Sequence, residues 1–140
     1  YIVKGKTEAK LIAGGGRPKN TPQGWFVEPT VFTDVANDAV ISREEIFGPV
    51  LSIIPYEGED EAISLANDSE FGLGGSVWSA DSEHALKVAK QVNCGTVGIN
   101  GYVPSIGAPF GGVKGSGIGR ELGPEAVDNY QSLKSTYIMN

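Results

Sequence analysis

The chain has 140 residues, of which 40% are hydrophobic, so it is long enough for one domain with a buried core. Its formal net charge of −6 excludes the basic surface that nucleic acid or an anionic membrane requires, and neither is an expected partner. The single cysteine, Cys94, excludes an internal disulfide and favours a reducing compartment, most simply the cytoplasm.

Residues 1–49 predict short and irregular elements. We expect a helix that ends near Glu8, a strand at residues 10–13, a turn-rich linker at residues 14–24 and a strand at residues 26–32. Tyr1 is not an initiator methionine, and no signal-peptide pattern follows it. We therefore expect the chain to begin within a longer structure.

From residue 50 onward, strand-like and helix-like patterns alternate. The expected elements are a strand at 50–54, a helix at 59–67, a strand at 75–78, a helix that begins after Asp81 and ends at Cys94–Gly95, and a strand at 96–99. This alternation predicts an α/β fold with a doubly wound, mostly parallel sheet. Such sheets bind ligands beyond the carboxyl ends of their strands, so residues 100–112 are the expected wall of a pocket.

After Gly123 we expect a short helix at residues 124–130 and then a strand at residues 132–139. An unpaired strand edge at a terminus invites aggregation. We therefore expect this last segment to pair with a partner, and another subunit is one candidate.

Residues 44–50 read Glu-Glu-Ile-Phe-Gly-Pro-Val and offer a carboxylate beside an aromatic ring. Glu45 can accept hydrogen bonds from two neighbouring sugar hydroxyls, and Phe47 offers a flat face to a planar ring, which together would clamp a nucleotide. Alternatively, Glu44 and Glu45 cap a helix and Phe47 fills the core. Chemistry alone favours this second interpretation.

Residues 109–123 contain six glycines and include the run Gly-Ser-Gly-Ile-Gly. The run lacks the G-x-G-x-x-G spacing of a dinucleotide loop, so phosphate binding is not the favoured interpretation. We expect close backbone crossings and turns of positive φ, with Lys114 and Arg120 bonded to carbonyl groups. Phe110 lines an apolar pocket or lies in the core.

Cys94 and His84 are the only candidates for a nucleophile and its base. Ten residues of continuous helix would separate them by about 15 Å, which excludes a hydrogen bond. We expect Cys94 to be a small buried hydrophobe and His84 to be exposed. No residue of the chain is assigned a catalytic role, and no set of metal ligands is expected.

Five ordered blocks resemble the C-terminal part of the aldehyde dehydrogenase superfamily over essentially all of the chain. They are residues 24–32, residues 44–50, residues 66–68 with 71–73, residues 95–97 with 99–100, and residues 109–123. The resemblance implies that Glu45 holds the ribose of the nicotinamide half of NAD or NADP and that Phe47 packs near the nicotinamide ring. It also implies that Phe110 lines the aldehyde tunnel.

In that family a cysteine thiolate attacks the aldehyde, and hydride passes to NAD(P)+ from the thiohemiacetal. The family's nucleophile lies in a Gly-Gln-x-Cys block that precedes the position of Tyr1, and Cys94 does not match it. The resemblance therefore implies that the chain is an incomplete fragment, inactive alone, of an enzyme that oxidises an aldehyde to a carboxylic acid.

The resemblance assigns residues 1–131 to the catalytic domain and residues 132–140 to a terminal oligomerisation strand, so we expect a homo-oligomer, either a dimer or a tetramer. Gly98 departs from the tryptophan common in the family's Gly-Thr-Val-Trp-Ile-Asn block. The apolar residues of the segment 100–109 favour a hydrophobic aldehyde over a choline-type cation. The alternative is a non-enzymatic assembly or interaction module derived from the same fold.

Overall fold

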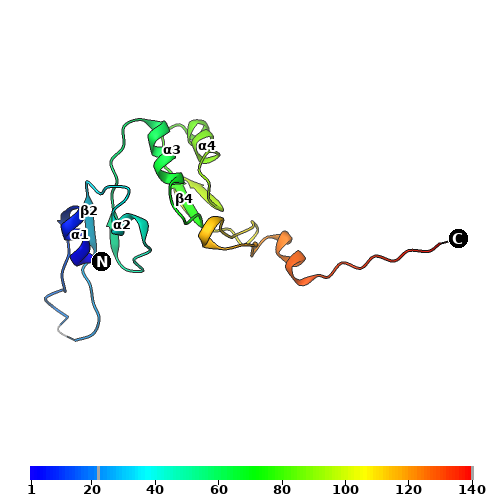
Figure 1. Cartoon of the computed structure of the whole chain (residues 1–140), viewed down its shortest axis with the longest axis horizontal. Coiled ribbons are helices and arrows are strands. Elements are labelled where there is room, and N and C mark those ends of the chain that lie inside the picture. The colour runs from blue at the N-terminus through cyan, green and yellow to red at the C-terminus, as the bar shows by residue number, and fades with distance from the viewer. Residues whose placement is uncertain (22, 140) are drawn as a thin grey trace. The chain divides into compact units, whose positions relative to one another are not determined.

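The computed structural model describes residues 1–21 and 23–139, which divide into two compact units at residues 65 and 66 (Figure 1). The predicted linker at 14–24 and the predicted segment 132–140 each include one position, 22 and 140 respectively, outside the described residues. The helix α3 (Glu59–Asn67) crosses the division between the units and matches its predicted bounds.

Unit 1 holds a three-stranded sheet in the order β1 (Lys10–Ala13), β2 (Thr30–Thr33) and β3 (Val50–Ser52). β1 and β2 are antiparallel, whereas β2 and β3 are parallel. The helices α1 (Ile2–Glu8) and α2 (Val40–Arg43) belong to the same unit. The helix to Glu8 and the strand at residues 10–13 are therefore as predicted.

The core of unit 1 forms around the ring of Phe32, which is fully buried. It is completed by Val35, Ala39 and Ile41, with Ile46 and other partly buried side chains packed against them. Alternating buried positions in β2 place Thr30 and Phe32 on the same inward side of the sheet. This core anchors the segment between α2 and β3.

The predicted strand at 26–32 is wrong at its start. Pairing begins only at Thr30, whose N–H donates to the carbonyl of Pro49 at 2.8 Å. Pro29 has no N–H to contribute to a ladder, so the residues before it follow the loop instead.

Unit 2 contains a strand–helix–strand element: β4 (Gly74–Val77), α4 (Ser82–Ala89) and β5 (Thr96–Ile99). β4 and β5 are parallel, in register from Gly74 opposite Thr96 to Val77 opposite Ile99. The helix α4 packs on both strands, and its Ala85 is fully buried. The predicted alternation is thus confirmed here, but β3 pairs with β2 rather than joining β4.

The helix α4 ends at Ala89, five residues before the predicted end at Cys94. The backbone beyond it closes into tighter turns, in which the N–H of Gln91 donates to the carbonyl of Val88 at 2.9 Å. The N–H of Asn93 donates to the side chain of Asn67 at 2.6 Å. This contact with a residue distant in sequence holds the backbone at Asn93 in a non-helical conformation.

Asp81 begins α4 as predicted, because its Oδ1 accepts hydrogen bonds of 3.0 Å from the N–H groups of both Glu83 and His84. We expect Asp81→Ala in the full-length protein to destabilise this helix by about 1 kcal/mol. Faster hydrogen exchange of the α4 amides would be the measurement. Asp81→Asn is the matched control, since asparagine caps as well as aspartate, and equal exchange in the alanine variant would contradict the role.

Beyond β5 the chain forms two short 3₁₀ helices, η1 (Lys114–Ser116) and η2 (Pro124–Tyr130), the second at its predicted place. Residues 131–139 then run exposed, with no helix or strand assigned to them (Figure 1). Pairing of this segment with another subunit stays a prediction. In the part of the chain that the structure describes, no helix is long and apolar enough to cross a membrane.

Candidate functional site

The Glu-Glu-Ile-Phe-Gly-Pro motif forms the connection from α2 to β3 in unit 1. The helix ends at Arg43, the backbone becomes extended at Glu44, and Ile46 packs against the core. Glu45 and Phe47, on either side of this anchor, are exposed. Partly buried Ile46, between these two exposed residues, thus holds both predicted cofactor residues in one short segment.

Phe47 is 89% exposed, so the interpretation that placed its ring in the core is wrong. Its φ of 52° lies in the left-handed region, which is a genuine outlier for a bulky side chain. Strained backbone of this kind is concentrated at functional sites. Exposure and strain together make Phe47 a candidate contact for a planar ring.

Glu45 has an exposed carboxylate that makes no hydrogen bond or ion pair with the described residues. Its neighbour Glu44 differs, because it accepts a hydrogen bond of 2.6 Å from the hydroxyl of Tyr1. That bond is the main cause that raises the pKa of Tyr1 above its ordinary value. Both glutamates follow the C-terminal end of α2, so neither caps the start of that helix.

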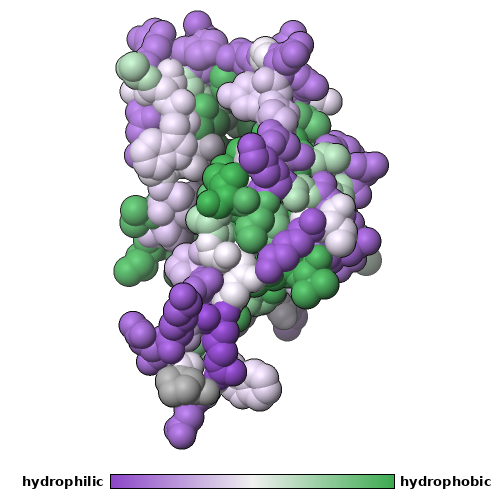
Figure 2. Space-filling model, turned by 90° about the vertical axis from the view of Figure 1, so that its left-hand side faces the viewer, coloured by the Kyte–Doolittle hydropathy of each residue, from purple (hydrophilic) through white to green (hydrophobic). Residues whose placement is uncertain are grey.

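Hydrophobic side chains other than Phe47 also reach the surface. Figure 2 shows hydrophobic surface open to solvent beside strongly hydrophilic surface. Within unit 1, Trp25, Phe26 and Leu51 are each more than half exposed. Exposure alone therefore does not identify Phe47, and the neighbouring carboxylate and the strained backbone are what distinguish it.

Phe110, the predicted substrate residue, lies in unit 2, where it forms an isolated antiparallel bridge with Glu121. Each of the two residues donates its N–H to the other's carbonyl at 2.7 Å. The side chain of Phe110 is half-buried, so it is neither a core residue nor fully free. The bridge holds its backbone at the end of the predicted pocket loop.

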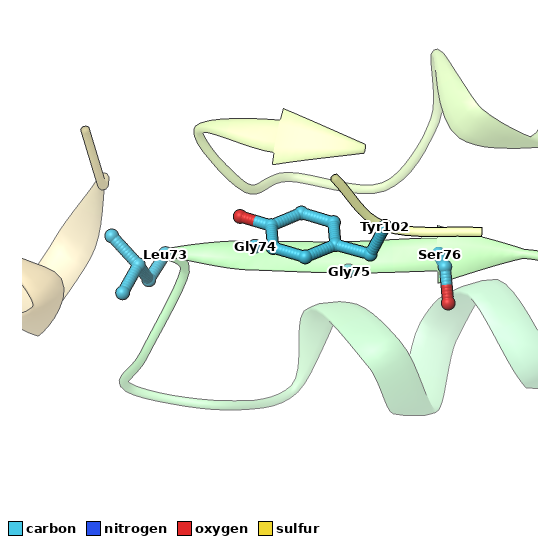
Figure 3. A pocket seen from close by; sticks show the side chains of 5 residues that line it. All are labelled: Leu73, Gly74, Gly75, Ser76 and Tyr102. Atoms are coloured by element: carbon cyan, nitrogen blue, oxygen red, sulfur yellow. The ribbon is translucent and has the colours of Figure 1, made fainter. Parts of the chain in front are cut away.

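A hollow of about 300 Å³ lies on β4, lined by Leu73, Gly74, Gly75, Ser76 and Tyr102. Figure 3 shows the ring of Tyr102 lying along the strand, with its hydroxyl toward Leu73 and Gly74. Tyr102 comes from the loop 100–112 that was predicted to form a pocket wall. Sequence reasoning missed this residue, although the glycine pair in a strand signals a close approach of another group.

Cys94 is half-buried rather than buried, and its Sγ–H donates to the carbonyl of Thr96 at 3.3 Å. His84 is exposed on α4, as predicted. Because that helix ends at Ala89, the separation estimated from a continuous helix does not apply. No group of metal-ligating side chains occurs among the described residues.

The glycines of residues 109–123 allow tight backbone turns. Gly117, Gly119 and Gly123 have positive φ, as expected for turns. Lys114 donates to the carbonyl of Asn67 at 2.8 Å, and Arg120 donates to the carbonyls of Gly112 and Gly119 at 2.8 and 2.7 Å. Both cations are thus bonded to carbonyl groups, as predicted.

The sequence model of the aldehyde dehydrogenase family matches residues 1–136. The chain belongs to the aldehyde dehydrogenase family. Among its relatives, geranial dehydrogenase of Castellaniella defragrans is 63% identical over 99% of this chain and 29% of the relative's own length. Betaine aldehyde dehydrogenase of Rhizobium leguminosarum is 49% identical, also over 99% of the chain and 29% of the relative.

Solved aldehyde dehydrogenases share the fold. That of Mycobacterium tuberculosis, complexed with NAD+, superposes with a TM-score of 0.92 at 50% identity, covering 99% of this chain and 30% of the other. The NAD+ complex from Bacillus cereus has the same TM-score at 48% identity, covering 99% of this chain and 28% of the other. The chain thus has the α/β aldehyde dehydrogenase fold and spans about three tenths of the length of its relatives.

Proposed function

We propose that this chain is a C-terminal segment of an enzyme that oxidises an aldehyde to a carboxylic acid with NAD+ or NADP+. In this proposal, a cysteine outside the chain attacks the aldehyde carbonyl to form a thiohemiacetal. The observation that carries the proposal is the exposed Glu45–Phe47 turn in a chain whose residues 1–136 match the family. The segment alone is proposed to be inactive, because no residue in it is assigned as nucleophile.

The chemistry of the Glu45–Phe47 turn fits the nicotinamide half of the cofactor. The carboxylate of Glu45 has lone pairs for two hydroxyl donors, which suits a ribose. The exposed ring of Phe47 offers a flat apolar face, which suits a planar heterocycle. Bound NAD(P)+ would supply the hydride acceptor, and the role of these two residues is to hold it in place.

We propose a hydrophobic aldehyde as substrate, with Phe110 as one wall of its site. The loop before Phe110 presents Val103 and Ile106, which are 90% and 84% exposed. These side chains offer apolar contacts and no charge for a cationic substrate. The higher identity to a geranial dehydrogenase than to a betaine aldehyde dehydrogenase supports the same choice.

The assembly and location of the enzyme are also proposals. We propose that residues 132–140 pair with another subunit in a dimer or tetramer, because the described part of this segment is exposed and unpaired within the chain. A cytoplasmic location fits a chain whose single cysteine forms no disulfide. Light scattering on the full-length protein, with and without this segment, measures the oligomeric state.

The test of function is an assay of the full-length protein with geranial and with betaine aldehyde, each with NAD+ and with NADP+. We expect reduction of the cofactor and release of the carboxylic acid, with the larger kcat/KM for geranial. Failure to oxidise either aldehyde, with other aldehydes also inert, would overturn the proposal and favour the assembly module. A larger kcat/KM for betaine aldehyde would overturn only the substrate choice.

A further inference from the structure

The loop between β5 and Phe110 rests on two glycines of unit 2. A Cβ added at Gly95 would overlap the carbonyl oxygen of Gly111 and lie 2.6 Å from its carbon. A Cβ added at Gly98 would overlap the carbonyl oxygen of Gly101 and lie 2.9 Å from its carbon. Backbone atoms cannot swing aside as a flexible side chain can, so a side chain at either glycine requires the backbone at that end of the loop to shift.

The side chain of Asn100 fastens the beginning of this loop. Its Oδ1 accepts from the N–H of Ser79 at 2.8 Å, and its Nδ2 donates to the carbonyl of Ser79 at 2.9 Å. The carboxamide thereby replaces the main chain in the ladder just beyond Val77 and Ile99. The main chain, at a φ of 54° in Asn100, is released to turn back over β5.

Tyr102 follows this turn and lies against β4 (Figure 3). A Cβ added at Gly74 would overlap the Tyr102 hydroxyl and lie 2.7 Å from the ring carbon that carries it. A Cβ at Gly98 would also lie 3.1 Å from the Cα of Tyr102. Gly98 therefore decides how deeply the backbone of Tyr102 sits on the sheet, and with it the starting position of Val103.

We propose that Gly98 is a specificity-determining position for the aldehyde. By letting Gly101 and Tyr102 settle onto β5, it sets the position of the apolar loop that ends at Phe110. A side chain at residue 98 pushes the loop outward by more than an ångström, because ordinary van der Waals contact must be restored at the Gly101 carbonyl. This inference rests on the proposed function and adds a residue that itself need not touch the substrate.

The matched control is the same change three residues along. A Cβ added at Gly101 meets nothing within 4 Å, and its φ lies outside the positive range that disfavours alanine. Gly101→Ala adds the same methyl group to the same turn, but the methyl group meets no atom that would force the loop away from β5. It is therefore expected to retain the wild-type ratio of activities.

The experiment compares kcat/KM for geranial with that for a short straight-chain aldehyde in full-length wild-type, Gly98→Ala and Gly101→Ala proteins. We expect Gly98→Ala to change the ratio about tenfold, the size of a one-methylene misfit in an apolar pocket, with the KM for the cofactor unchanged. An unchanged ratio, or an equal loss for both aldehydes, would overturn the inference by showing a purely structural role.

Asn100→Gly provides a second variant if Gly98→Ala does not fold, since glycine accepts the positive φ while the two bonds to Ser79 are lost. It is expected to move the same ratio, and an unmoved ratio would overturn the inference. An inactive wild-type protein would refute the proposed function and this inference with it. An active wild-type with an unmoved ratio in the folded variants would refute the inference alone.

Discussion

Glu45→Gln in the full-length protein is expected to lower the rate of hydride transfer about 10- to 100-fold, the equivalent of one charge-assisted hydrogen bond. Glutamine keeps the size of the side chain but removes the negative charge and one of the two acceptor oxygens. Because the carboxylate is exposed and has no partner among the described residues, its loss disturbs no bond of the fold. Single-turnover and steady-state rates of cofactor reduction are the measurements.

Glu44→Gln is the matched control for this prediction. Glu44 is the adjacent residue, has the same side chain and is also exposed, but its carboxylate already accepts from the hydroxyl of Tyr1. An exposed contact of this kind contributes little, so the control should keep nearly the wild-type rate. Equal single-turnover rates in wild-type and Glu45→Gln would remove Glu45 from the cofactor site.

Phe110→Ala is expected to change the preference among aldehydes more than the overall rate. Removing the ring enlarges an apolar wall, so the ratio of kcat/KM between geranial and a short aldehyde should fall about 10- to 100-fold. The mutual bonds between the backbones of Phe110 and Glu121 do not involve the side chain, so the loop end should keep its position. A panel of aldehydes of increasing length, assayed with saturating cofactor, is the measurement.

Phe110→Leu is the control, because it retains an apolar side chain of intermediate size and should give an intermediate ratio. The KM for the cofactor should be unchanged in both variants. A uniform loss across all aldehydes, accompanied by a lower Tm, would instead assign the half-buried ring to the protein core.

The elements that the sequence predicted best are those that depend on local chemistry. The helix at residues 59–67 begins with three acidic residues that favour its positive N-terminal end, and its bounds are as predicted. The start of α4 follows from the capping side chain of Asp81. The strand at 96–99 is likewise in place. Each of these signals lies within a few residues of the element that it defines.

The elements that the sequence predicted poorly depend on distant partners. The end of α4 is set in part by Asn67, which binds the backbone at Asn93. The start of β2 is set by its pairing with the segment at Pro49 and Val50. The same pairing separates β3 from β4, although the alternating pattern had suggested one sheet. Periodicity reports which residues suit a strand, but not which strand lies beside it.

The candidate site was also predicted only in part from the sequence. Residue chemistry alone favoured a core position for Phe47, and only the resemblance to the family raised it, with Glu45, to a cofactor contact. The structure shows that the ring of Phe47 is exposed and therefore not part of the core. The packing of partly buried Ile46 against the core, between the two residues, depends on tertiary structure and is specified by no local pattern.

By itself, the sequence determined the α/β class, the resemblance to aldehyde dehydrogenases, the bounds of α3 and the start of α4, because these depend on composition, ordered motifs and side chains close in the chain. Only the tertiary structure showed that the carbonyl of Gly101 packs against Gly98 and that the ring of Tyr102 packs against Gly74. Those contacts arise where backbone segments meet across a sheet. The sequence shows that residues 74 and 98 are glycines, but only the structure shows which atoms would collide with a side chain at each of them.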